Sequence, residues 1–362
     1  MGFPSAYEKF RSAMIAYEEN LRAIGRSETT IQNEEFVFKM FSDFMLENKL
    51  WDRREEGFTD VQAWRDQLRR DGKKPTTIRQ YLTVLSALYN FASSDELGEN
   101  RWYDRNPVSK LLMPDTRKLE KRPYDQLLTD EQVLLLWRNN PPAKLKRPEL
   151  WPRNYAIVIL LLTTEIRNSE LLALTPNDLD WENAELTVEH GKGDKFRQVD
   201  FPIIAQTAIR MYLNSGIRPV TVDSTEPLFG TEATFEFKGD NKGEEWHAGT
   251  RQWLSDIVRR HVKSVTGVDM IRSHDLRHVG ARLDLNSGMT FEELQAKLGH
   301  ESVSTTQVYS GKLTSRKNRR LTKVVQEEKE RQARRNIDKL EAAGDDFFGT
   351  LRLKQIPQPG IA

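Results

Sequence analysis

The chain has 362 residues and a net charge of +1, and this length predicts about two domains, each able to bury its own core. It contains no cysteine, which excludes disulfide bonds and thiolate zinc sites, and it has no apolar run of membrane length. The N-terminus also lacks the apolar core of a signal peptide, so these features together favour a cytoplasmic protein.

The first part of the chain, residues 1–110, predicts a small all-helical domain. Gly25 and Gly72 stand where they can end helices, and no strand pattern appears. Apolar residues recur three and four positions apart in four stretches: Tyr7–Ile24, Val37–Met45, Val61–Leu68 and Ile78–Ala92.

A basic and hydroxyl-bearing cluster marks the start of the fourth predicted helix. It consists of Lys73, Lys74, Thr76, Thr77 and Arg79. Free backbone N–H groups, the helix dipole and the lysines can together bind a phosphate. An ordinary solvated helix cap fits the local sequence equally well.

A linker is predicted at residues 111–125, between two domains. The stretch from Lys110 to Arg122 has five basic residues against two acidic ones, and Pro114 and Pro123 interrupt regular structure. The basic bias suits contact with an anionic partner, and an ordinary exposed linker is the alternative.

The second domain, residues 126–315, opens with the capping-box pattern of Thr129 to Gln132. A helix that is apolar throughout, Ala156–Leu162, predicts a core element that leads to Arg167. Because an unpaired buried charge is costly, Arg167 needs an anionic partner. A salt bridge with Glu165 or Glu170 is one solution, and a bound anion is another.

A β-hairpin is predicted next. Glu185–Glu189 and Phe196–Phe201 alternate like strands, and Gly191–Lys195 joins them. Lys192 lies in the turn, where a lysine usually serves only solubility. Helices are expected at Ile203–Leu213 and Arg251–Lys263, with a loop and one short strand pair between them.

Four residues near the end of this domain can address one phosphate. His274 and Arg277 share a helix face, being three residues apart, and His300 follows a second helix that Gly299 ends. Tyr309 supplies a phenol that can attack phosphorus and form an ester.

Two alternatives apply to these histidines. His274 and His278 have the i, i+4 spacing of a metal pair, but Asp275 and Arg277 stand between them where zinc proteases have H-E-x-x-H. His300 taken alone fits a helix cap or a core position.

These motifs, in this order, resemble those of the tyrosine recombinase (phage integrase) family: T-G-L-R-x-x-E-L, G-K-G-x-K-x-R, H-x-x-R, L-G-H and Tyr. Glu165 stands where that pattern has glycine. The resemblance implies six catalytic residues: Arg167, Lys192, His274, Arg277, His300 and Tyr309.

The resemblance also implies a mainly α fold. An all-helical N-terminal core-binding domain and a mostly helical catalytic domain with a small antiparallel β-sheet would form a C-shaped clamp on DNA. The implied DNA contacts are Lys73, Lys74, Thr76, Thr77, Arg79 and Arg197. The net charge of +1 allows this, because phosphate contacts depend on local basic faces.

The implied activity is site-specific recombination or integration through a 3′-phosphotyrosine at Tyr309, without ATP, metal or other cofactor. The expected partners are double-stranded recombination sites, a tetramer on paired sites and accessory DNA-bending proteins, in the cytoplasm at the nucleoid. The alternatives are strand swivelling as in a type IB topoisomerase, and an accessory DNA-binding protein whose active site is weakened by Glu165.

The tail, residues 316–362, is expected to be helical where acids and bases pair at i, i+4. Its apolar stripe is too thin to fold alone, and Phe347 and Phe348 have no evident core in their own chain. We therefore expect the tail to dock on a neighbouring protomer, with a disordered tail as the alternative.

Overall fold

The structure is a computed structural model that describes residues 6–50, 57–116, 127–188, 197–218, 223–230, 248–299 and 316–344, without the side chains of 316–322. The chain divides into two compact units, Met1–Lys121 and Arg122–Ala362. Each unit is described by itself.

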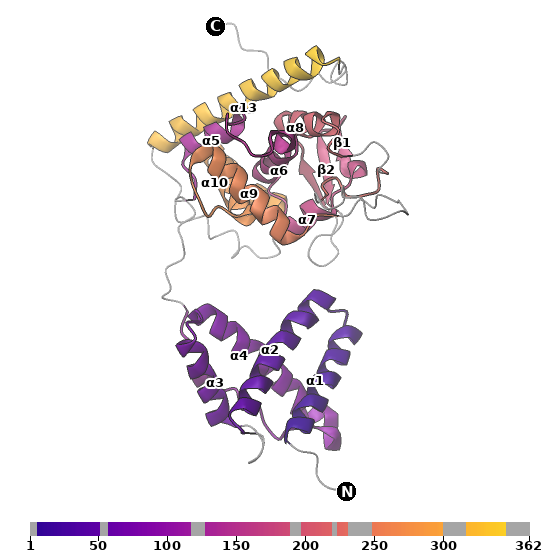
Figure 1. Cartoon of the computed structure of the whole chain (residues 1–362), viewed down its shortest axis with the longest axis vertical. Coiled ribbons are helices and arrows are strands. Elements are labelled where there is room, and N and C mark those ends of the chain that lie inside the picture. The colour runs from indigo at the N-terminus through magenta and orange to yellow at the C-terminus, as the bar shows by residue number, and fades with distance from the viewer. Residues whose placement is uncertain are drawn as a thin grey trace. The chain divides into compact units, whose positions relative to one another are not determined.

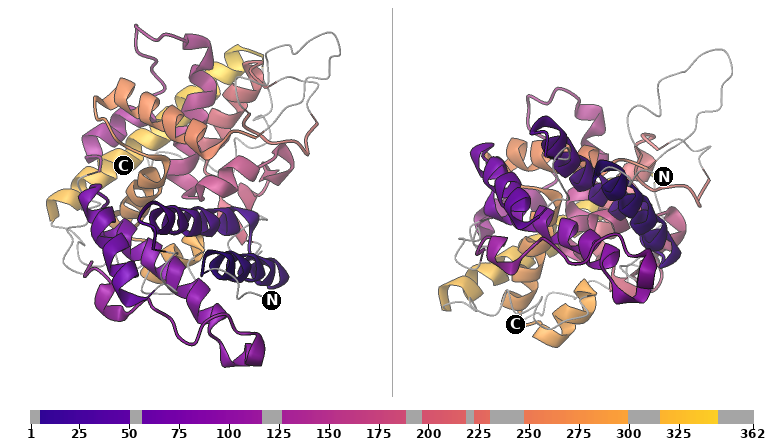
Figure 2. Two further views of the ribbon diagram at one scale, coloured as in Figure 1. Left: turned by 60° about the horizontal axis from the view of Figure 1, so that its bottom comes forward. Right: turned by 90° about the horizontal axis from the view of Figure 1, so that it is seen from below.

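The first unit is helical wherever the structure describes regular elements between residues 6 and 116 (Figures 1 and 2). Ser27 caps the second helix by accepting a hydrogen bond from the Thr30 N–H, and Pro75 occupies the first turn of the fourth. The helices are α1 (Ala6–Ala23), α2 (Glu28–Glu47), α3 (Phe58–Arg70), α4 (Pro75–Ala92), η1 (Asp95–Asn100) and η2 (Lys110–Leu112).

The core of the first unit consists of the apolar faces that the sequence predicts. Phe10, Phe41 and Tyr89 are fully buried, and the Phe10 ring lies 5.7 Å from Phe41 and 6.1 Å from Tyr89. Aromatic rings at these separations add to the stabilisation that burial gives. The buried aromatic residues of α1, α2 and α4 therefore serve packing.

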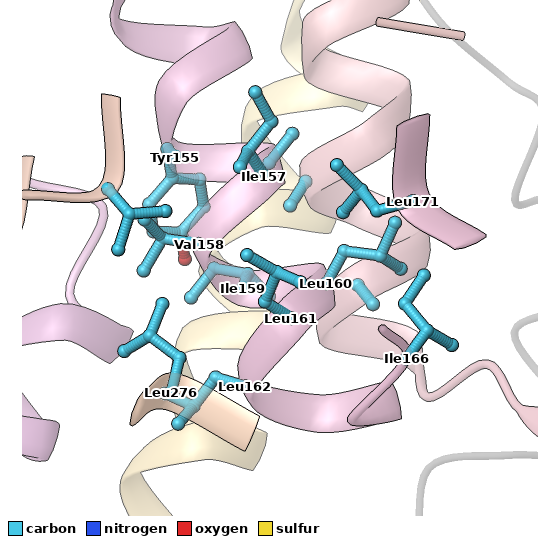
Figure 3. Close-up of a cluster of buried hydrophobic side chains, with 14 of the residues drawn as sticks. Tyr155, Ile157, Val158, Ile159, Leu160, Leu161, Leu162, Ile166, Leu171 and Leu276 are labelled. Atoms are coloured by element: carbon cyan, nitrogen blue, oxygen red, sulfur yellow. The ribbon is translucent and has the colours of Figure 1, made fainter. Parts of the chain in front are cut away.

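The second unit is organised around one buried helix, α6 (Trp151–Thr164), in which every residue from Tyr155 to Thr164 is buried (Figure 3). An element that is apolar on all sides must be covered on all sides. The covering helices are α5 (Asp130–Trp137), α8 (Ile203–Asn214), α9 (Arg251–Thr266) and α10 (Ser273–Ser287).

A small antiparallel sheet lies in the same unit, in the order β1 (Leu179–Asp180), β2 (Glu185–Val188) and β3 (Arg197–Asp200). The hairpin register pairs Glu185 with Asp200 and Val188 with Arg197, which confirms the predicted strand pair. Further on, Gly230 and Ala248 form one isolated antiparallel bridge.

The remaining elements of this unit are short or lie near its end. They are η4 (Pro148–Leu150), α7 (Asn168–Ala173), η5 (Pro176–Asp178), α11 (Phe291–Leu298) and α13 (Arg316–Ala342). The mainly helical fold with a small sheet agrees with the expectation from the sequence. Among the described residues, no helix is long and apolar enough to cross a membrane.

The C-terminal helix α13 packs on α5, α8 and α10 of its own chain (Figure 1). Val325 and Ala333 are buried in the main core, and the Asn336 side-chain amide donates to the Thr207 hydroxyl of α8 at 3.2 Å. Helix α13 therefore packs within its own chain, and the docking of the tail on a neighbouring protomer stays a prediction. The apolar stripe is thin because buried polar residues, Gln332 among them, complete the contact face. Residues 345–362, including Phe347 and Phe348, lie outside the described residues.

One buried histidine gives this unit a pH-dependent stability. The imidazole of His261 in α9 stacks on Trp151 with the ring centroids 4.4 Å apart. Burial lowers the pKa of His261 to about 3. The unfolded chain therefore binds a proton near pH 6.5 that the folded chain binds only near pH 3.

We expect the free energy of unfolding to fall by about 1.4 kcal/mol per pH unit below pH 6 through His261 alone. His261→Phe keeps an aromatic ring against Trp151 and cannot titrate, so its stability should decline less steeply. Urea unfolding of both proteins between pH 7 and pH 5 measures the two slopes. Parallel slopes would contradict a neutral, buried His261.

Candidate active site

A tight reversal of the chain places Arg167 at the start of α7. Helix α6 ends at Thr164, and Glu165 follows in the left-handed conformation, with φ 55° and ψ 26°. Arg167 is the N-cap residue of α7, and its N–H donates to Glu170 Oε2 at 2.6 Å. The buried helix thus delivers Arg167 at a fixed point, because both sides of the turn are anchored.

The Glu170 carboxylate binds two arginines at once. Arg167 donates from one terminal nitrogen to Oε1 at 2.8 Å. Arg197 donates from both terminal nitrogens, at 2.8 Å to each carboxylate oxygen. Although burial opposes it, the hydrogen bonds from Arg197 and Arg167 lower the pKa of Glu170 to about 2. Glu170 is therefore ionised at every pH at which the protein works.

Three consecutive carbonyls at the C-terminal end of α11 complete the site. The carbonyl of Lys297 accepts from Arg197 Nε at 3.3 Å, that of Leu298 from Arg277 at 2.7 Å, and that of Gly299 from Arg167 at 2.8 Å. The last carbonyls of a helix lack partners within it and carry its negative dipole end. They are therefore suited to gather cations.

Arg277 and His274 come from the first turns of α10. Arg277 is 2% exposed, and it donates to the Glu165 carbonyl as well as to Leu298. Burial, with Arg167 close by, lowers the pKa of Arg277 to about 10. The two guanidiniums therefore repel each other across the site, as two groups built to share an anion would.

His274 is exposed beside the two arginines, and its ring contacts His278 at a centroid distance of 4.7 Å. Partial desolvation and Arg277 lower the pKa of His274 below its usual value, so the imidazole is neutral near pH 7. A neutral imidazole can accept a proton. In the described part of the chain, no group of three His, Asp or Glu side chains could hold a metal ion.

The Glu165 side chain lies in the core against Lys297. It is completely buried, and Lys297 Nζ donates to Glu165 Oε1 at 3.0 Å and also to Asp284. Although burial opposes it, the two carboxylates raise the pKa of Lys297, so its ammonium stays charged. The sequence pattern gave no sign of this lysine, because its partners come from other elements.

Arg197 is bound within the protein. Its guanidinium donates to Glu170 and to the Lys297 carbonyl, and its side chain is 14% exposed, so its contact with the DNA backbone stays a prediction. Arg197 belongs to β3 and Glu170 to α7, so only the tertiary structure brings the two residues together.

The predicted phosphate cluster of the first unit lies at the N-terminus of α4. Lys73, Lys74 and Thr76 are exposed there, and Thr77 is half-buried. Arg79 donates to the carbonyl of Pro114 at 3.0 Å, which ties α4 to the segment that follows η2. The two lysines thus remain directed to solvent beside free helix N–H groups.

The structure brings Arg167, Arg277 and His274 together. The other predicted catalytic residues, Lys192, His300 and Tyr309, lie outside the described residues, as does Lys195.

Comparison with known proteins gives a consistent result. The sequence matches the phage integrase family over residues 128–316. It is 30% identical over 253 residues to tyrosine recombinase XerC of Bacillus licheniformis, which covers 70% of this chain and 76% of that protein. Against XerC of Bacillus subtilis the identity is 27% over 285 residues, covering 78% and 86%.

Solved structures show a shared fold. The Tn1549 transposon integrase in complex with circular intermediate DNA has a TM-score of 0.59 and 18% identity, covering 88% of this chain and 98% of that one. At this level of identity the likeness concerns the fold.

We expect Glu170→Gln to lower the free energy of unfolding at pH 7 by about 3 kcal/mol, because the pKa of Glu170 is lowered from 4.5 to about 2 in the folded state. This stabilisation is present above pH 4.5 and is lost as the pH falls towards 2. Urea unfolding at pH 7 measures it, with exposed Glu182→Gln as the matched control. Equal stability of the two variants would contradict the assignment of Glu170 as the anchor of both arginines.

Proposed function

The chain belongs to the phage integrase family of tyrosine recombinases, and on this premise we propose that it cleaves and rejoins double-stranded DNA at specific sites through a covalent bond to Tyr309. The observation that carries the proposal is the gathering of Arg167, Arg197 and Arg277 on the carbonyls that end α11, where a single carboxylate, Glu170, binds two of the three. Three guanidiniums against one carboxylate leave two positive charges in this cluster. A phosphodiester is the anion that this excess suits.

The two arginines next to each other on the α11 carbonyls have the main chemical role. As the phosphate is attacked, negative charge concentrates on its two nonbridging oxygens, and Arg167 and Arg277 stabilise that charge. Their positions are fixed beforehand by Glu170 and by the carbonyls of Leu298 and Gly299, so little reorganisation is needed during the reaction.

The proposed reaction forms one phosphorus–oxygen bond and breaks another. The Tyr309 phenol attacks phosphorus, giving up its proton with the help of His274, and His300 donates a hydrogen bond to the phosphate. The 5′ oxygen leaves as a hydroxyl after taking a proton from Lys192. The 3′-phosphotyrosine ester keeps the energy of the broken bond, so another 5′ hydroxyl can reverse the step. Because the ester keeps this energy, the reaction uses no ATP. Because arginines supply the positive charge, it uses no metal ion.

The DNA partner is proposed from both units. The exposed Lys73 and Lys74 with the free N–H groups at the start of α4 form a phosphate contact on the first unit. The Tn1549 integrase and XerH structures of similar fold are complexes with DNA. We infer that this chain also binds DNA. It would act as a tetramer on paired sites, with the help of accessory DNA-bending proteins, and be located at the nucleoid.

Tyr309→Phe should abolish the covalent adduct, because phenylalanine has no oxygen to form the ester. DNA attached to the purified chain is recovered from cells, and its junctions are sequenced to obtain the target site. A nicked suicide substrate carrying that site then measures adduct formation. Tyr309→Phe should bind this DNA as the wild type does, and a normal yield of adduct from it would refute the role of Tyr309. Relaxation of a supercoiled plasmid without exchange between two sites would favour the topoisomerase alternative.

Arg167→Ala and Arg277→Ala should each reduce cleavage by about 10²–10³-fold, because one donor to the transition state is lost. Lys192→Ala should also be slow, but a 5′-bridging phosphorothiolate should rescue it, since the sulfur leaves without a proton. Exposed Arg260→Ala in α9 is the matched control and should cleave normally. Rescue of the arginine variants but not of Lys192→Ala by the sulfur substrate would show that the two roles are reversed.

A further inference from the structure

Glu165 is a costly residue for its position. It has a φ of 55°, in the left-handed region that favours glycine, and its carboxylate is completely buried. The backbone carbonyl of the same residue accepts a hydrogen bond from Arg277. The conformation of Glu165 therefore bears directly on the placement of a catalytic guanidinium.

Gly280 of α10 provides the space for this side chain. A Cβ at position 280 would lie 2.4 Å from the Leu162 carbonyl oxygen and 2.8 Å from Glu165 Cγ. Contacts that short would force the end of α6 and α10 apart. The close approach of the two helices and the burial of Glu165 thus depend on a residue without a side chain in α10, three positions after Arg277.

Lys297 pairs with this buried acid, whose pKa is raised by burial to about 8. Its Nζ contacts Glu165 at 3.0 Å and Asp284 of α10, and its side chain is 11% exposed. The ammonium therefore connects the end of α6, the middle of α10 and the last turn of α11. Lys329 of α13 is a further charged group close to Asp284 and Glu165.

The same lysine belongs to the backbone that holds the arginines. Its own carbonyl accepts from Arg197, and the next carbonyl, of Leu298, accepts from Arg277. Arg277 thus rests on two carbonyls, those of Glu165 and Leu298, and Lys297 links the residues that carry them.

We propose that Lys297 is a positioning residue for DNA cleavage, which fixes Glu165 and the end of α11 so that Arg277 meets the scissile phosphate. This proposal rests on the function proposed above. Lys297 acts through Glu165 and Arg277 and does not itself touch the DNA. A displacement of a reacting group by about 1 Å can cost about 10²-fold in rate, so a small shift of this carbonyl pair is sufficient to be measured.

The first test is Lys297→Met, which keeps the length of the side chain and removes the charge. On the suicide substrate with the recovered site, we expect half-site binding within about twofold of wild type and cleavage slower by about tenfold to a hundredfold. Lys263→Met is the matched control, because Lys263 is also paired with an acid, Asp269, but on the surface. Cleavage by Lys297→Met at the rate of this control would overturn the proposal.

A double-mutant cycle asks whether Lys297 acts through Glu165. Glu165→Gly suits the left-handed backbone but removes the same contact with Lys297, so we expect it to slow cleavage about as much as Lys297→Met does. The double variant Glu165→Gly/Lys297→Met should then cleave within about threefold of Glu165→Gly alone, as strongly coupled sites do. Additive losses would overturn the proposal. If Lys297→Met fails to fold, the comparison of these two variants decides in the same way.

A neutral substrate separates positioning from loss of stability. A methylphosphonate at the scissile position has a methyl group in place of one nonbridging oxygen and carries no charge, so its cleavage depends less on the arginines. The ratio of wild-type to Lys297→Met rates should therefore shrink on this substrate, whereas a merely structural defect would leave it unchanged and overturn the proposal. Failure of the wild-type chain to form any adduct would instead refute the proposed function itself.

Discussion

The site depends on a balance between three guanidiniums and the few groups that hold them. Glu170 neutralises one of the three charges, and the carbonyls that end α11 hold all three by their dipoles. Neither support is a full countercharge for Arg167 or Arg277. Their mutual repulsion therefore persists in the free protein, and an anion bound between them would relieve it.

The buried helix α6 turns this balance into a fixed geometry. Because all residues from Tyr155 to Thr164 are packed, the end of the helix cannot shift without disturbing the core. Glu165 and Arg167 follow this end directly, and α10, which carries Arg277, packs on the same helix. Arg167 and Arg277 thus lie at the starts of helices, and the support under them comes from the core.

The C-terminal helix belongs to the same support. It covers α5, α8 and α10 with a face on which polar residues are buried beside apolar ones, Asn336 being bound to Thr207. A pattern that counts only apolar residues underestimates such a face, because the buried polar residues of α13 also contribute to it. Its contact with α10 lies on the element that carries His274 and Arg277, so the tail can influence the site without touching it.

The sequence by itself determined the local elements and the family. Periodicity and caps predicted the helices and the hairpin, and the motifs predicted Arg167, His274 and Arg277 as site residues, because helix faces and turns depend on neighbours a few residues apart. Only the tertiary structure decided that Arg197 binds Glu170 and that Lys297 pairs with Glu165, 132 residues away. Such contacts arise only when separate helices pack. A charge that becomes buried must then be paired, because leaving it unpaired costs free energy, and no local sequence pattern shows which partner it will have.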